Sequence, residues 1–259
     1  MQKLSVVVIT YNEEKNLNRC LKSVKNIADE IVVVDSFSTD STKQTALKHN
    51  AIFIQHPFED FVKQHQFADK QAQNDLIFSI DADEVVSPQL EKSILKVKKN
   101  RKHDGYLVSR LTNYCGTWIH HCGWYPDRKL RLYNRQKGLW RGKLVHESFQ
   151  LFDNATTGRL QGDLWHYSYY TVEQHKSRTE KYSALSAKAY FEQRKKAPLV
   201  KVWFSPAVKF VRDYFVNLGF LDGKAGFTVC KISAKATHKK YKMLRDLYKN
   251  QKAEGNFES

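Results

Sequence analysis

The chain has 259 residues, of which 41% are apolar and 13% aromatic, so it can bury a sizeable core and wholesale disorder is excluded. It carries 43 Lys and Arg against 27 Asp and Glu, and the net charge of +16 favours polyanionic partners: nucleic acid, an anionic membrane surface or a phosphate-bearing substrate. Four cysteines are too few for a disulfide-rich scaffold, and no run of about 18 apolar residues predicts a transmembrane helix.

The first hundred residues alternate between short apolar runs and amphipathic stretches. Continuous apolar, largely β-branched runs predict buried strands at 4–9, 31–34, 51–54 and 76–80. Helical periodicity predicts helices at 17–24, 41–49, 61–73 and 89–98. This alternation predicts an α/β sheet whose parallel strands are joined by right-handed crossovers.

The rest of the chain falls into two parts with different sequence patterns. Strands are predicted at 106–111 and 129–133, an aromatic surface loop at 113–127, and further mixed structure at 140–149 and 160–167. Helices are predicted at 172–195, 206–218 and 226–249, separated by Pro198, by Pro206 and by Gly219, Gly223 and Gly226. We therefore expect a catalytic domain at 1–170 and a helical region at 171–259. The second part has 19 basic and 8 acidic residues, so it holds +11 of the +16.

Polar residues follow three of the predicted strands, where ligands of open α/β sheets bind. Asp35 follows the second strand, and Asp81-Ala82-Asp83-Glu84 follows the fourth. Asp81 and Asp83 lie at i and i+2 of an extended segment, so they project to the same side and can share a divalent cation that binds a diphosphate. The alternative is an acidic cap before the helix that Pro88 opens.

Three motifs at this spacing resemble the family 2 glycosyltransferases of the GT-A fold over roughly the first 150 residues: Thr10-Tyr11-Asn12-Glu13, the Asp35 segment and the Asp81–Glu84 segment. The resemblance implies a Rossmann-like mixed sheet with flanking helices. It implies that Thr10, Tyr11, Asn12, Glu13 and Asp35 hold the nucleotide, and that Asp81 and Asp83 hold Mg²⁺ or Mn²⁺ on its diphosphate. The alternative for Asp35 is turn chemistry with Ser38.

Gln64-His65-Gln66 resembles the helix that precedes the paired-acid strand in this family. The resemblance places Gln64 near the nucleotide and leaves His65 open; a helix-surface role is the alternative for both. His166 follows a predicted strand. Because some GT-A enzymes take a third metal ligand from a late histidine, His166 is a candidate ligand or else a hydrogen-bonded histidine at the sheet edge.

An inverting glycosyl transfer needs a base that removes the proton of the acceptor hydroxyl. Arg131-Leu132-Tyr133, Trp140 and Val145-His146-Glu147 stand in the order found in bacterial family 2 members that build lipopolysaccharide cores. The resemblance implies Glu147 as the base. His146 is a candidate for orienting a substrate or binding phosphate, with a structural role as the alternative.

Substrate contacts are also expected from Arg128 and Arg131, whose planar guanidinium groups can bind phosphate or sugar, and from Trp124, which offers a stacking face. Cys115, His120, His121 and Cys122 could be read as zinc ligands. Two adjacent histidines rarely reach one tetrahedral ion, so an acceptor-facing loop is the preferred interpretation.

The predicted helices after Pro206 repeat apolar residues at i, i+3, i+4 and i+7, with lysines interspersed. They either pack on the catalytic domain or lie on an anionic membrane. Residues 4–9 form too short an apolar run for a signal peptide, so we expect a cytoplasmic protein, peripheral on the inner face of the membrane.

The sequence thus predicts an inverting, metal-dependent transferase that moves a hexose from a nucleotide sugar, with UDP-glucose as the favoured donor, to a lipid-linked or envelope glycan. Two alternatives from other classes are a nucleic-acid-binding protein, prompted by the charge, and a nucleotidyltransferase that uses the paired acids. The acids at the predicted strand ends disfavour the first. The segment Tyr11–Glu13 disfavours the second, because nucleotidyltransferases usually have a glycine-rich basic loop there.

Overall fold

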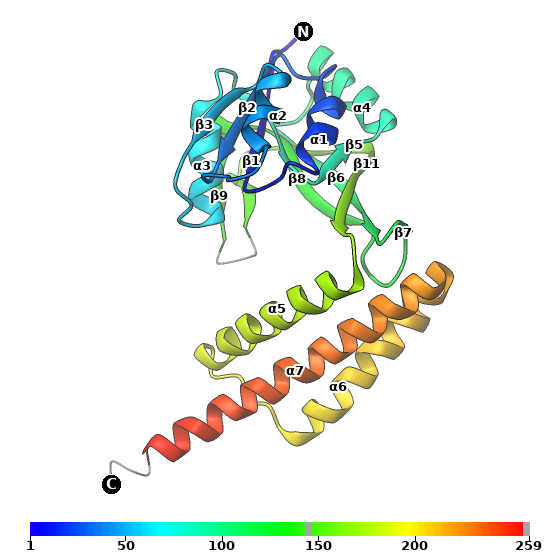
Figure 1. Ribbon diagram of the computed structural model, residues 1–259. Helices are drawn as coiled ribbons and strands as arrows, with labels where there is room; N and C mark the ends of the chain where they lie inside the picture. The colour runs from blue at the N-terminus through cyan, green and yellow to red at the C-terminus, as the bar shows by residue number, and fades with distance from the viewer. Residues whose placement is uncertain (143–146, 256–259) are drawn as a thin grey trace. The chain divides into compact units, whose positions relative to one another are not determined.

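The computed structural model describes residues 1–142 and 147–255 (Figure 1). The chain divides into two compact units. The first comprises residues 1–111 and 126–167, and the second comprises residues 112–125 and 168–259. The aromatic segment 112–125 therefore belongs to the same unit as the C-terminal helices. No described helix is long and apolar enough to cross a membrane.

The first unit is built on one mixed sheet. Its strand order is β3-β2-β1-β4-β8-β6-β11-β5, and a further strand, β7, pairs with the end of β6 in the second unit. The strands are β1 (Leu4–Thr10), β2 (Glu30–Asp35), β3 (Ile52–Gln55), β4 (Leu76–Asp81), β5 (Glu84–Val86), β6 (Gly105–Tyr114), β7 (Thr117–Ile119), β8 (Asp127–Asn134) and β11 (Thr157–Tyr169). β1 to β4 are parallel as predicted, and β8 joins β4 in antiparallel orientation.

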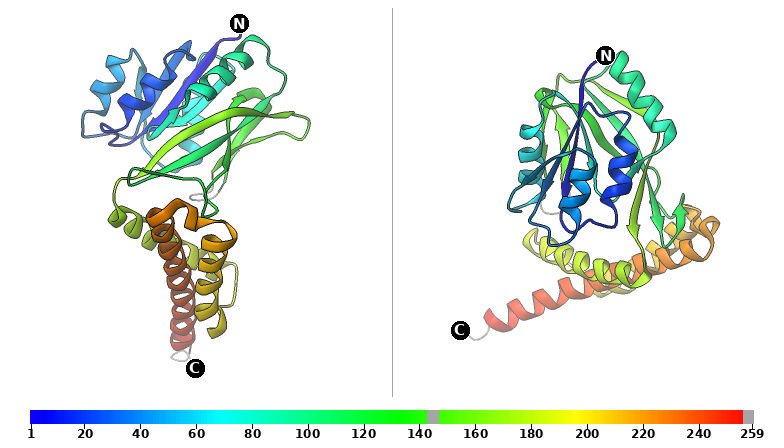
Figure 2. Two further views of the ribbon diagram at one scale, coloured as in Figure 1. Left: turned by 90° about the vertical axis from the view of Figure 1, so that its right-hand side faces the viewer. Right: turned by 45° about the horizontal axis from the view of Figure 1, so that its top comes forward.

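Helices cover both faces of this sheet (Figures 1 and 2). They are α1 (Leu17–Val24), α2 (Thr42–Lys48), α3 (Phe61–Gln71) and α4 (Pro88–Lys99). Successive side chains of a strand point to opposite faces. Accordingly Val6 and Val8 of β1 pack in one core cluster with α1 and α4, while Val7 packs in another with Ala68 of α3. A two-stranded hairpin of β9 (Gly138–Arg141) and β10 (Ser148–Leu151) completes the unit.

The register of the parallel strands brings the predicted motifs to one edge. Thr10 of β1 lies opposite Asp35 of β2, and Ile9 lies opposite Asp81 of β4. The carboxyl ends of all three strands therefore meet, and we call this edge the carboxyl rim. The predicted α/β architecture is confirmed. In the first hundred residues, the ends of each predicted helix and strand differ from the observed ends by two residues at most.

The second unit contains α5 (Val172–Glu192), α6 (Leu199–Val211) and α7 (Gly223–Gly255), and both α5 and α6 pack along α7 (Figure 1). The helix predicted at 206–218 exists, but its predicted start was wrong. α6 begins seven residues earlier, a π-helical turn occupies Arg212–Val216, and Pro206 lies inside the helix. Proline cannot donate to the carbonyl four residues back. Here the Nδ1 atom of His238 on α7 lies 3.0 Å from the Val202 carbonyl oxygen, so a tertiary contact supplies the missing partner.

Candidate active site

The loops that follow β1 and β2 are tied together at the carboxyl rim. Thr10 Oγ1 donates to Asp35 Oδ1 at 3.0 Å, and the Ser38 amide donates to Asp35 Oδ2 at 2.7 Å. The Asn12 amide donates to Ser38 Oγ at 2.7 Å. Asp35 is fully buried, and its carboxylate holds the turn through Ser38, which is the alternative role suggested by the sequence. Tyr11, by contrast, is 61% exposed and presents its ring at the rim.

Asn12 is the residue that lets the first loop turn. Its φ of 54° is left-handed, a conformation that asparagine tolerates better than most residues. Its side-chain oxygen accepts from the Thr39 amide at 2.9 Å. The Glu13 amide donates to Thr42 Oγ1 at 2.9 Å. Gln64, buried on α3, donates to Ser36 Oγ at 3.1 Å and so joins the same rim.

The Asp81–Glu84 segment is held by two arginines from neighbouring strands. Arg131 of β8 binds Asp81 through both terminal nitrogens, one of them at 3.2 Å from Oδ1. Glu84 is completely buried, accepts from Arg131 at 3.1 Å, and lies 3.4 Å from Arg110 of β6. Burial raises the pKa of Glu84. For Asp81, burial opposes ionisation, but the Arg131 guanidinium holds the pKa well below its usual range.

Asp83 and His166 form a second pair at the same segment. Pairing of β11 with β5 sets His166 opposite Glu84, and His166 Nε2 lies 3.3 Å from Asp83 Oδ2. The buried Nδ1 atom of His166 has no hydrogen-bond partner among the described residues. One carboxylate and one imidazole whose donor atoms converge fit a small divalent cation that takes its remaining ligands from phosphate and water. Among the described residues no group of three or more His, Cys, Asp and Glu converges on such an ion.

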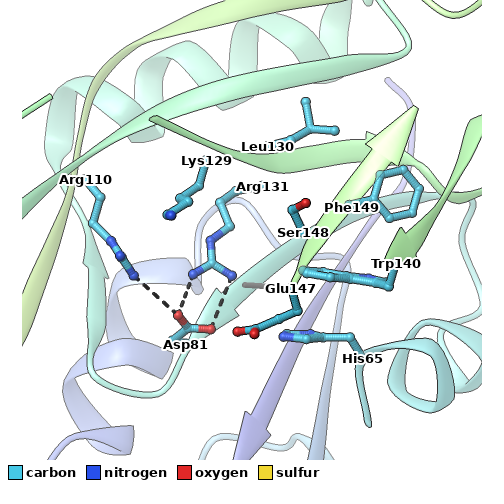
Figure 3. Close-up of a pocket in the computed structure, with 10 residues that line it drawn as sticks. All are labelled: His65, Asp81, Arg110, Lys129, Leu130, Arg131, Trp140, Glu147, Ser148 and Phe149. Atoms are coloured by element: carbon cyan, nitrogen blue, oxygen red, sulfur yellow. Dashed lines mark hydrogen bonds and ion pairs between the residues drawn. The ribbon is translucent and has the colours of Figure 1, made fainter. Parts of the chain in front are cut away.

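Asp81 and Arg131 also line a pocket of about 310 Å³ (Figure 3). Its lining residues are His65, Asp81, Arg110, Lys129, Leu130, Arg131, Trp140, Glu147, Ser148 and Phe149. Glu147 directly precedes β10, and its side chain points toward Asp81 and His65 (Figure 3). Buried atoms without a hydrogen-bond partner in the described chain include Glu147 Oε2, His65 Nδ1 and Arg131 Nε. Three such atoms in one pocket indicate a polar ligand, because unpaired buried polar groups are costly.

The His65 imidazole is held flat in this pocket. It stacks on Trp140 with ring centroids 3.8 Å apart and planes 6° apart. Burial lowers the pKa of His65 to about 4, so the ring is neutral at physiological pH. A neutral imidazole can donate one hydrogen bond and accept another, which suits contact with a hydroxyl group.

A buried acid supports the pocket wall from behind. Asp69 of α3 accepts from Tyr133 Oη at 3.0 Å and from Trp140 Nε1 at 3.0 Å. Burial raises the pKa of Asp69 to about 7, despite these hydrogen bonds. Because Trp140 in turn stacks on His65, Asp69 fixes the orientation of a ring that lines the pocket.

The raised pKa of Asp69 predicts how stability depends on pH. Above about pH 4 the unfolded chain releases the Asp69 proton while the folded chain keeps it, so the free energy of unfolding falls as the pH rises from about 4 through about 7. In Asp69→Asn this part of the fall is absent. Urea denaturation of both proteins at several pH values measures it, with Asp153→Asn at an exposed site as the control. Parallel pH profiles for the wild type and Asp69→Asn would contradict the assignment.

Several predicted residues lie elsewhere or outside the described chain. Arg128 is exposed on β8, whereas Arg131 is buried in the pocket. Trp124 belongs to the second unit, where it packs with Tyr114 and Tyr169. His146 lies outside the described residues.

The possible zinc ligands have other roles in the second unit. His121 Nδ1 lies 2.8 Å from Asp222 Oδ1. Cys122 is buried beside Cys230, whereas Cys115 is exposed. Burial and these neighbours raise the pKa of the Cys122 thiol, which disfavours the thiolate that zinc requires.

Two charged pocket residues were not predicted, namely Arg110 and Lys129. The sequence could have indicated Arg110. Alternate residues of a strand face the same side, and Arg110 therefore shares a side with Tyr106 and Val108, which face the core. An arginine at such a position requires acids nearby, which the buried Glu84 and the partly exposed Asp127 provide. Lys129, whose amine lies 3.2 Å from Asp127, carries no comparable signal.

A family model and several known proteins match this chain. The family model for glycosyl transferase family 2 matches residues 5–155. An uncharacterized glycosyltransferase of Rickettsia prowazekii is 32% identical over 95% of this chain and 88% of its own length. The lipopolysaccharide core biosynthesis glycosyltransferase LpsC of Rhizobium meliloti is 32% identical over 86% of this chain and 85% of its own. S. aureus TarS (residues 1–349) aligns in structure over 93% of this chain and 91% of that one, at 16% identity and a TM-score of 0.47.

The family match covers more than half of the chain and includes the carboxyl rim and the pocket residues through Phe149. The relatives extend the similarity through most of the second unit. The GT-A fold class expected from the motifs is thereby confirmed, and the nucleic-acid-binding and nucleotidyltransferase alternatives are set aside. The chain belongs to glycosyl transferase family 2 and is a glycosyltransferase.

Proposed function

We propose that the chain is an inverting hexosyltransferase that uses a divalent metal and a nucleotide sugar, with UDP-glucose as the donor. The observation that carries the proposal is the position of Glu147. Its carboxylate has a buried oxygen without a partner in the described chain, and it shares a pocket with Asp81 and Arg131 of the paired-acid segment. A free carboxylate beside a phosphate-binding segment is what a base for an incoming hydroxyl requires.

We place the nucleotide at the carboxyl rim. The exposed ring of Tyr11 offers a stacking face for the base, and Asp35 and Gln64 hold the two loops beneath it. Thr10, Asn12 and Glu13 shape the first loop through the hydrogen bonds described above. Uridine as the base and glucose as the sugar are proposed from the motif resemblance.

The metal would be Mg²⁺ or Mn²⁺, held by Asp83 and His166, with Asp81 at the border between the metal and the sugar pocket. When bound, the ion neutralises charge that develops on the leaving diphosphate. Arg131 and Arg110 keep Asp81 ionised and fixed in place. Glu147 takes the proton from the acceptor hydroxyl, whose oxygen then attacks the anomeric carbon in a single displacement that inverts its configuration.

The acceptor we propose is a lipid-linked or lipopolysaccharide-type glycan. The support is the function named for LpsC, which is 32% identical to this chain. We place the enzyme in the cytoplasm at the inner face of the membrane. Residues 1–170 would form the catalytic domain, with Arg128, Arg131, Trp124 and His146 as candidate substrate contacts, and 171–259 would contact the membrane or the acceptor.

The donor and the metal are tested together by thermal unfolding. UDP-glucose with Mn²⁺ should raise the melting temperature, since ligand at about one hundred times its Kd adds about 2.7 kcal/mol to the free energy of unfolding. Asp83→Asn should remove the metal-dependent part of this shift, and EDTA should do the same to the wild type. The exposed Asp153→Asn serves as the control. A wild-type shift that is unchanged by EDTA, or a larger shift with another nucleotide sugar, would contradict this assignment.

A further inference from the structure

We propose that an exposed apolar face of α6 docks on an anionic lipid bilayer. This α6 face consists of Leu199, Val200, Trp203, Phe204, Val208 and Val211, all more than half exposed. The most exposed are Val200, Trp203 and Phe204, at 66%, 68% and 66%. Folded proteins rarely leave so many large apolar side chains of one helix in water without a partner.

The opposite side of the same helix is already occupied. Val202 is buried, and its carbonyl oxygen meets His238 of α7. Phe210 stacks on Tyr214 and contacts Phe227 of α7 edge-on. At about 100° per residue, Val202 and Phe210 point toward α7, whereas Val200, Phe204, Val208 and Val211 follow one another along the other side. Leu199 and Trp203 lie at the border nearer α7, and the exposed Trp203 ring contacts His238 of α7 with centroids 5.2 Å apart. The α6 face is therefore left over after the helix has packed on α7.

The charges around the α6 face have one sign. Between Gln193 and Leu221 the sequence contains six basic residues and one acid, Asp213. Asp213 is buried and paired with Lys209 and Arg212, so it presents no negative charge at this surface. Lys201 and Arg212, about three turns apart, lie along one edge of the face and are exposed. Apolar side chains bordered by exposed cations match the acyl and headgroup layers of an anionic bilayer.

The same charges disfavour a second copy of the chain as the occupant. A symmetric dimer through this face would bring two identical apolar strips together along with their basic edges. Like charges at the border of an interface oppose association, whereas anionic headgroups neutralise them. α6 is 13 residues long, about 20 Å, which suits a helix that lies in the plane of the interface.

This inference rests on the proposed function only where it places the acceptor in a membrane, and its test needs neither donor nor acceptor. The full chain is mixed with phosphatidylcholine vesicles prepared with or without phosphatidylglycerol, and the bound fraction is measured by flotation. We expect binding to the anionic vesicles that weakens as salt is raised. Trp203→Ser with Phe204→Ser should lower the apparent affinity about tenfold or more.

Matched variants separate surface chemistry from loss of fold. Leu47→Ser with Phe152→Ser removes two exposed apolar side chains from the first unit and should bind vesicles like the wild type. Lys201→Glu changes only an edge charge and should weaken binding to anionic vesicles alone. Circular dichroism checks that each variant is folded, and Val200→Ser with Val208→Ser replaces the aromatic variant if that one is not.

Three results would overturn the inference. The first is equal flotation of the wild type and a folded α6-face variant, and the second is no flotation of the wild type. The third is a wild-type dimer in sedimentation velocity that the α6-face variants convert to monomer without any vesicle binding, which would assign the face to a second copy. A wild-type protein that binds vesicles but shows no transfer activity would count against the proposed function, and it would not contradict the docking surface.

Discussion

Glu147→Gln is expected to lower kcat by about 10³-fold while leaving donor binding unchanged. The amide has the shape of the carboxylate but cannot take a proton, and general base catalysis typically contributes 10² to 10⁴-fold. The other residues that line the pocket should keep their positions. Glu147 Oε2 makes no hydrogen bond to the described chain, so the substitution breaks none at this atom. The measurement pairs a transfer assay with the melting-temperature shift produced by UDP-glucose and Mn²⁺.

Glu59→Gln is the matched control for this variant. Glu59 is exposed in the first unit, where it pairs with Lys63, and the same change of carboxylate to amide should leave kcat within about twofold of the wild type. A Glu147→Gln enzyme with full kcat would remove Glu147 from the role of base. A variant that loses both transfer and the donor-induced shift would instead indicate that Glu147 holds the donor.

Arg131→Ala is expected to destabilise the fold by about 3–5 kcal/mol and to abolish transfer. Arg131 is buried and pairs with both Asp81 and Glu84, so its removal leaves Arg110, at 3.4 Å, as the remaining cationic partner of the fully buried Glu84 among the described residues. Removing one partner of a buried ion pair costs more than the pair itself contributes, because the remaining charge stays desolvated. Urea denaturation followed by circular dichroism measures the loss.

Two further variants test that explanation. Arg128→Ala, at an exposed position of the same strand, should change the free energy of unfolding by about 0.5 kcal/mol or less. Adding Glu84→Gln to Arg131→Ala should recover part of the stability, since the amide oxygen can still accept from the Asp81 amide and no unpaired carboxylate remains buried. If Arg131→Ala were no less stable than Arg128→Ala, the two-arginine arrangement would not support the paired-acid segment.

Much of the carboxyl rim was predictable because it depends on local sequence and on one rule of α/β sheets. Buried strands read as continuous apolar runs, and parallel strands end on the same side. The sequence therefore predicts that Asp35 and Asp81 lie at one edge with the residues that follow β1, and the strand register places them so. The same reasoning failed at Pro206, since a proline inside a helix is tolerated only when another element, here His238, satisfies the freed carbonyl.

The pocket depended instead on pairings that no local pattern encodes. Arg131 meets Asp81 across 50 residues, and His65 stacks on Trp140, which Asp69 holds across 71 residues. Such contacts depend on which antiparallel strands join the parallel core and in what register. A shift of one residue in that register would turn Arg131 and Arg110 away from the acids.

The sequence by itself determined the elements of the first unit, the acids at the ends of its strands and the surplus of positive charge in the last third. Periodicity, turn chemistry and composition are local properties, so they can be read along the chain. Only the tertiary structure decided which charges are neutralised and which remain available. It pairs Arg110 and Arg131 with the buried Glu84, leaves Glu147 Oε2 without a partner in the described chain, and turns the apolar side of α6 outward beside the exposed Lys201. The reason is that desolvation and packing depend on neighbours that are distant in sequence.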